Sequence, residues 1–77
     1  MDTATRILKW REFAELSREE LAKAVGVSLQ AVKYWEGGTH PPTLGNLEKI
    51  VGACKISMAG FWGPLPGNRL NRGVSKL

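Results

Sequence analysis

Residues 17–38, SREELAKAVGVSLQAVKYWEGG, decide the fold. Ser17 is followed three residues later by Glu20, which is the spacing of a capping box, because the hydroxyl accepts the amide hydrogen of Glu20 while the carboxylate accepts that of Ser17. A helix is therefore predicted to begin at Arg18. Its apolar stripe consists of Leu21, Ala22 and Val25. Gly26 predicts the end of this helix, because glycine readily adopts the left-handed conformation of a C′ residue.

A second helix is predicted over residues 29–36, after a tight turn at residues 26–28. Ser28 is its N-cap candidate. Val32 and Trp35 lie three residues apart and share one face, which we expect to be buried. The side chains that point elsewhere are Leu29, Gln30, Lys33 and Tyr34. This outward face is the candidate functional site.

The helical spacing of apolar residues predicts three more helices, over residues 3–14, residues 44–53 and a short segment through residue 62. Ser57 is the N-cap candidate of the short last helix. Two glycines and two prolines within residues 37–42 interrupt the helical pattern between the predicted helices at 29–36 and 44–53. We find no convincing strand and no internal repeat. The expected fold class is therefore all-α, with five helices.

The chain divides into a helical part, residues 1–62, and a Pro/Gly-rich, basic tail, residues 63–77, which is expected to be disordered. The whole chain has 11 basic and 7 acidic residues and a net charge of +4. Because the tail holds three of the basic residues and no acid, the helical part has a net charge of only +1. A basic balance suits a polyanionic partner without establishing one.

Length and composition exclude several classes of protein. A chain of 77 residues forms one domain, and a domain of this size buries only about 60 % of its unfolded surface, which leaves little core for a catalytic cavity. An enzyme is therefore disfavoured. No run approaches the roughly 20 apolar residues of a membrane span, and a cytoplasmic location is expected. The single cysteine, Cys54, supports neither a disulfide nor a zinc site, and we expect it to be buried, with no metal and no cofactor in the protein.

Several short motifs occur together in the helical part. They are L-S-x-E-E-L-A at 16–22, G-V-S at 26–28, W-E-x-G at 35–38, P-T-L at 42–44 and I-S at 56–57. In combination they resemble the helix-turn-helix domain of the Cro and lambda-repressor type, also called XRE-type. Glu15 departs from the family, which often has glycine at that place, and Arg18 stands where glutamine often follows the cap serine. The second departure changes a contact to DNA.

The resemblance implies a role for each residue of the candidate site. The residues expected to face DNA bases are Leu29, Gln30, Lys33 and Tyr34. Gln30 can pair with adenine through two hydrogen bonds, Lys33 can donate to guanine, and Leu29 can contact a thymine methyl group. The residues expected to contact phosphates are Ser17, Arg18, Ser28, Thr39 and His40. Ser17 and Ser28 are helix caps whether or not they contact DNA. An exposed lysine or leucine on a helix is also common in proteins without any ligand there.

Two further sets of residues have expected structural roles. The resemblance implies an ion pair between Arg11 and Glu36, beneath the second helix of the motif. At the end of the helical part, an apolar set is expected to form a dimer interface. Its members are Met58, Phe61 and Trp62.

We therefore expect a sequence-specific transcriptional regulator of double-stranded DNA, most simply a repressor from a prokaryote or a phage. As a homodimer it would place two recognition helices about one DNA turn, roughly 34 Å, apart on an inverted repeat. One alternative is an autoregulator of the antitoxin or restriction-controller kind, which also holds a protein partner. Another is a protein-interaction module that has lost DNA binding. The low charge of the helical part keeps the last alternative open.

Overall fold

The computed structural model of the protein describes residues 2–66. Its helices are α1 (Thr3–Phe13), α2 (Arg18–Val25), α3 (Leu29–Gly37), α4 (Leu44–Ala53) and α5 (Met58–Trp62). No strand occurs in this part of the chain, which confirms the expected all-α class of five helices. No helix within it is long and apolar enough to cross a membrane. The expected disordered tail lies outside the described residues from residue 67 onward.

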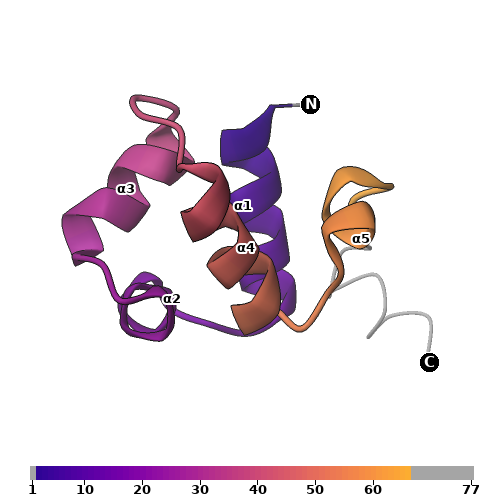
Figure 1. Ribbon diagram of the computed structural model, residues 1–77, viewed down its shortest axis with the longest axis horizontal. Helices are drawn as coiled ribbons and strands as arrows, with labels where there is room; N and C mark the ends of the chain where they lie inside the picture. Colours follow the sequence, from indigo (N-terminus) through magenta and orange to yellow (C-terminus); the bar gives the residue numbers. More distant parts are fainter. Residues whose placement is uncertain (1, 67–77) are drawn as a thin grey trace, which may run out of the picture.

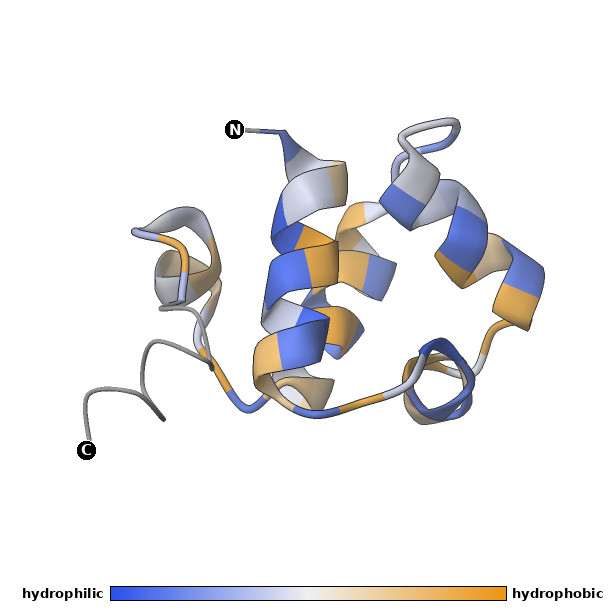
Figure 2. Cartoon of the chain, turned by 180° about the vertical axis from the view of Figure 1, so that it is seen from behind, coloured by the Kyte–Doolittle hydropathy of each residue, from blue (hydrophilic) through white to orange (hydrophobic). Residues whose placement is uncertain are grey.

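Helix α1 and helix α4 form the centre of the molecule. Figure 1 shows α2 and α3 on one side of this pair and α5 on the other. In that view α2 is seen end-on while α3 runs across the page, so the two helices cross steeply. Hydrophilic and hydrophobic residues alternate along α1 and α3 (Figure 2), as expected for helices that bury one face.

Each helix begins at a side chain that caps it. The N-cap residues are Asp2, Ser17, Ser28, Thr43 and Ser57. The capping box of α2 is complete, because the Glu20 amide donates to Ser17 Oγ over 3.0 Å and the Ser17 amide donates to Glu20 Oε1 over 2.7 Å. Caps of this kind typically stabilise a helix by about 1 kcal/mol. They explain why the helix starts agree with those predicted from the sequence.

Within residues 2–66, two residues other than glycine adopt left-handed backbone conformations, each at the end of a helix. Glu15 has φ 62° after α1, and Lys55 has φ 61° after α4. In both places a backbone amide still closes the last turn, since Leu16 N donates to Arg11 O and Ile56 N donates to Val51 O, each over 3.1 Å. For a residue with a Cβ this conformation costs roughly 1 to 2 kcal/mol. Each turn packs the next residue, Leu16 or Ile56, against the core, and this burial offsets the cost.

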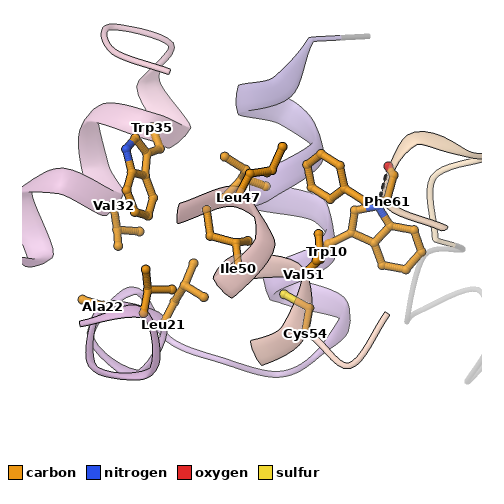
Figure 3. Close-up of a cluster of buried hydrophobic side chains, with 12 residues drawn as sticks. Trp10, Leu21, Ala22, Val32, Trp35, Leu47, Ile50, Val51, Cys54 and Phe61 are labelled. Carbon is orange, nitrogen blue, oxygen red and sulfur yellow. Dashed lines mark hydrogen bonds between the residues drawn. The ribbon is translucent and has the colours of Figure 1, made fainter. Parts of the chain in front are cut away.

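One apolar core joins all the helices. Its largest completely buried side chains come one from each of α1 to α5, and they are Ile7, Leu21, Val32, Ile50 and Phe61. Figure 3 shows four of them, Leu21, Val32, Ile50 and Phe61, together with Trp10, Trp35 and Leu47. Cys54 is buried in the same cluster, as expected, and burial raises the pKa of its thiol to about 11.

The expected dimer set needs a correction at Phe61. This side chain is 0 % exposed and belongs to the monomer core, so it cannot meet a second chain. Successive residues of a helix project about 100° apart, and α5 therefore turns the next residue, Trp62, outward, where it is 48 % exposed. Met58 packs partly buried against the core.

Helix α5 is fixed by side chains of α1 that the sequence did not single out for this role. Arg6 Nη1 donates to the carbonyl oxygens of Phe61 and Gly63 over 2.7 Å each. Trp10 Nε1 also donates to the Phe61 carbonyl, over 3.2 Å (Figure 3, dashed line). The Arg6 guanidinium lies 5.7 Å from the centre of the Trp62 ring. These contacts set which face of α5 is buried.

Substituting Lys55 tests the cost of the left-handed conformation. Lys55→Gly should raise the free energy of unfolding by roughly 1 kcal/mol, because glycine adopts φ > 0 without strain, and this gain corresponds to about 4 °C or more in Tm. Lys55→Ala is the matched control, since it removes the charge but keeps the Cβ. Thermal unfolding followed by circular dichroism measures both. A Lys55→Gly variant no more stable than Lys55→Ala would contradict the prediction.

Candidate nucleic-acid interface

The turn between α2 and α3 fixes the angle between the two helices. Gly26 has φ 86°, and its amide and that of Val27 both donate to the Ala22 carbonyl, over 2.8 and 3.0 Å. Ser28 then begins α3 by accepting the Ala31 amide over 3.1 Å. A side chain at residue 26 would be strained by the backbone alone, because nothing lies within 4 Å of a Cβ placed there.

Helix α3 is anchored on its inward face and open on its outward face. Val32 and Trp35 are buried in the core, as expected. On the other face Gln30, Lys33 and Tyr34 are exposed, whereas Leu29 is half-buried. The outward face thus carries an amide, an ammonium group and a phenol, which together offer several donors and two acceptors.

An aromatic contact orders the chain just after α3. The Tyr34 and His40 rings lie 4.9 Å apart between centres, at an interplanar angle of 60°. The Thr39 amide donates to the Tyr34 carbonyl over 3.1 Å. The predicted phosphate contacts Thr39 and His40 are therefore exposed beside the C-terminal end of α3 and next to the predicted base contact Tyr34. Nothing in the sequence indicated the ring contact.

The Arg11 and Glu36 pair expected from the sequence is present in the structure. Glu36 Oε2 accepts from Arg11 Nε over 2.5 Å, and Glu36 Oε1 accepts from Arg11 Nη2 over 3.2 Å. The third Arg11 donor, Nη1, reaches the Leu16 carbonyl over 2.8 Å. The Glu36 side chain is only 4 % exposed. Removal of one partner of a buried pair leaves an uncompensated charge and typically costs about 3 to 5 kcal/mol, so this pair holds α3 firmly to α1.

Arg18 takes part in the same cluster, which sequence reasoning missed. Its Nε donates to Glu36 Oε1 over 3.0 Å, while its side chain remains 48 % exposed. The two residues are 18 positions apart, and the position of Arg18 at the start of α2 suggested a phosphate contact but no ion pair with Glu36. The carboxylate of Glu36 is thus shared between a buried and an exposed guanidinium group.

The cluster opens into a surface pocket of about 280 Å³ beside α3. Its lining residues are Leu8, Arg18, Lys33, Glu36 and Gly37. The pocket brings together one predicted phosphate contact, Arg18, and one predicted base contact, Lys33. Among residues 2–66, no three His, Cys, Asp or Glu side chains lie close enough to hold a metal ion.

The two cap serines keep a hydrogen-bond donor for a ligand. Ser17 Oγ and Ser28 Oγ each accept one backbone amide of the helix that they cap. A hydroxyl group that accepts in this way can still donate its own hydrogen. Both serines are exposed. The caps therefore remain compatible with the phosphate contacts predicted for them.

Comparison with known proteins gives concordant matches. Residues 7–61 match the helix-turn-helix family. The chain is 32 % identical over 65 residues to the cryptic phage CTXphi transcriptional repressor RstR of Vibrio cholerae serotype O1. That alignment covers 80 % of this chain and 58 % of RstR, so the chain spans little more than half of its relative's length.

The fold also resembles a solved structure. The DNA-binding domain of the P22 c2 repressor, determined by nuclear magnetic resonance in solution, superposes with a TM-score of 0.76 at 29 % identity. The match covers 88 % of this chain and 95 % of that domain. The family match over most of the chain, the buried arginine and glutamate pair and the two crossed helices all agree. The chain belongs to the helix-turn-helix family of the Cro and lambda-repressor type.

Proposed function

We propose that this protein is a transcriptional repressor that recognises a specific sequence in double-stranded DNA by inserting α3 into the major groove. The observation that carries the proposal is the division of α3 into a face held in the core by Val32 and Trp35 and an open polar face. The major groove of B-DNA, about 12 Å wide, admits one α-helix. The similarity to the transcriptional repressor RstR and to the DNA-binding domain of the P22 c2 repressor supports the same function.

The outward face of α3 provides the base contacts of this proposal. Gln30 donates to and accepts from adenine, and Lys33 donates to guanine. Leu29, half-buried at the start of α3, offers its exposed part to a thymine methyl group. Tyr34 lies at the far end of the same face, against His40, and reaches a base or a phosphate.

The phosphate contacts surround α3. Ser17 and Arg18 stand at the start of α2, where backbone amides and the helix dipole favour an anion. Ser28 is placed in the same way at the start of α3, and Thr39 and His40 follow the end of α3. Contacts of this type position a protein on DNA without reading its sequence.

A homodimer on an inverted repeat completes the proposal. Trp62 is the exposed aromatic residue of α5, and the Arg6 guanidinium lies over its ring. The partly buried Met58 lies one helical turn before it. Two copies joined there by a two-fold axis would present their α3 helices to half-sites about one turn of DNA apart. Because its ligand is chromosomal or phage DNA, such a regulator acts in the cytoplasm of a bacterial cell.

A protein-interaction role without DNA remains the rival function, and the net charge of only +1 over residues 1–62 is the observation that favours it. Gel retardation with a duplex from the upstream region of the protein's own gene separates the two. A repressor retards this duplex in the presence of excess unrelated DNA. A protein-interaction module leaves it unretarded.

Alanine substitutions on α3 and α2 should have different effects on sequence preference. Gln30→Ala or Lys33→Ala should relax the preference at one or two base pairs, since a good bidentate contact supplies about 1 to 3 kcal/mol of discrimination. Arg18→Ala should weaken binding to all duplexes alike and lower the salt dependence by about one phosphate contact. Selection of binding sites from a random pool, followed by sequencing, measures all three. An unchanged preference in both α3 variants would show that another surface reads the bases.

Trp62→Ala should shift the protein from dimer to monomer, because truncation of a central aromatic residue commonly costs an interface 2 kcal/mol or more. Sedimentation at micromolar concentration, with and without duplex DNA, measures this shift. Leu44→Ala is the matched control, since Leu44 is an exposed apolar side chain at the start of α4, away from α5. A wild-type protein that stays monomeric on and off DNA would refute the dimer.

A further inference from the structure

The Glu36 carboxylate does more than pair with Arg11. Its two oxygens accept three hydrogen bonds, two from Arg11 and one from Arg18. Arg18 makes its bond through Nε, which leaves its two terminal nitrogens free of Glu36 on a side chain that is 48 % exposed. The Arg18 side chain and Lys33 line the same surface pocket beside α3.

We propose that Glu36 is a positioning residue for DNA binding, which holds the Arg18 guanidinium so that both terminal nitrogens bind one backbone phosphate beside Lys33. This inference rests on the proposed function. A free arginine side chain loses conformational entropy when it orders on a ligand. Arg18 is already ordered by Glu36, so less of that entropy is lost on binding.

The charges of the cluster are consistent with this role. A carboxylate beside a phosphate would normally repel it. Here Arg11 neutralises Glu36 from the buried side, and the three side chains together carry a net charge of +1. The Glu36 side chain is 4 % exposed, whereas that of Arg18 is 48 % exposed. A phosphate that approaches from solvent therefore meets the cation of the cluster and not its anion.

The chemistry requires arginine at this position. A planar guanidinium group can donate through Nε to one acceptor and through its two terminal nitrogens to another. A lysine ammonium group carries the same charge on a single nitrogen, without the fixed fork. Arg18→Lys should therefore bind DNA nearly as weakly as Arg18→Ala, although its net charge is unchanged.

Neutralising Glu36 changes the DNA affinity in opposite directions if Glu36 merely repels the phosphate and if it positions Arg18. If Glu36 were only a nearby negative charge, Glu36→Gln would strengthen DNA binding by removing repulsion. As a positioning residue it should weaken binding, by about threefold or more, because the hold on Arg18 is lost. This loss should largely disappear when Glu36→Gln is made in the Arg18→Ala background, whereas a loss caused by a loosened α3 would persist there. Glu48→Gln is the matched control: Glu48 is an exposed acid on α4, and its neutralisation makes the same change in net charge.

The experiment measures fluorescence anisotropy of a labelled 30-base-pair duplex of mixed sequence, at a temperature where circular dichroism shows every variant folded. We expect Glu36→Gln to bind more weakly than wild type, Glu48→Gln to bind at least as tightly, and Arg18→Lys to match Arg18→Ala within about twofold. Tighter binding by Glu36→Gln, or wild-type affinity of Arg18→Lys, would overturn the inference.

If Glu36→Gln does not fold, the comparison of Arg18→Lys with Arg18→Ala still decides the matter, because these substitutions leave the Arg11 and Glu36 pair in place. If wild type itself does not bind the duplex at low salt, the proposed function fails. If wild type binds and Arg18→Lys binds equally well, only the positioning role fails.

Discussion

The buried carboxylate of Glu36 is the constraint on which the arrangement of the helices depends. An isolated carboxylate at 4 % exposure would be strongly destabilising, and the Arg11 fork offsets that cost by occupying both of its oxygens. The same guanidinium group donates to the Leu16 carbonyl and so also fixes the link between α1 and α2. One ion pair thereby sets α3 relative to the helices on which it rests. Because the pair is polar and directional, it specifies an orientation that apolar packing alone would leave less defined.

The nine residues of α3 serve packing and recognition at once. Val32 and Trp35 project inward to the core, and Glu36 projects to Arg11, which leaves Gln30, Lys33 and Tyr34 at the surface. Packing on two different helices, α1 and α2, prevents the helix from rotating about its axis. The open face of α3 is therefore presented in a fixed orientation, which is what sequence recognition in a groove requires.

Sequence reasoning predicted the elements whose signals are local. The caps at Ser17 and Ser28 and the end of α2 at Gly26 follow from a few adjacent residues. The inward face of α3 followed equally well from spacing. The contacts that were missed join residues far apart in the chain, such as Arg18 with Glu36. Phe61 was misplaced because five residues are too few for a pattern to show which face of α5 is buried; donors from α1 decide it.

The most direct test of the account maps the DNA-binding surface residue by residue. Amide chemical shifts of the labelled protein are compared before and after addition of a duplex from its own upstream region. We expect the largest changes along the outward face of α3, at Gln30 and Lys33, and at the start of α2 around Arg18, with small changes in the core of α4 at Ile50. Changes concentrated at α5, with α3 unaffected, would contradict the assignment of α3 as the recognition helix.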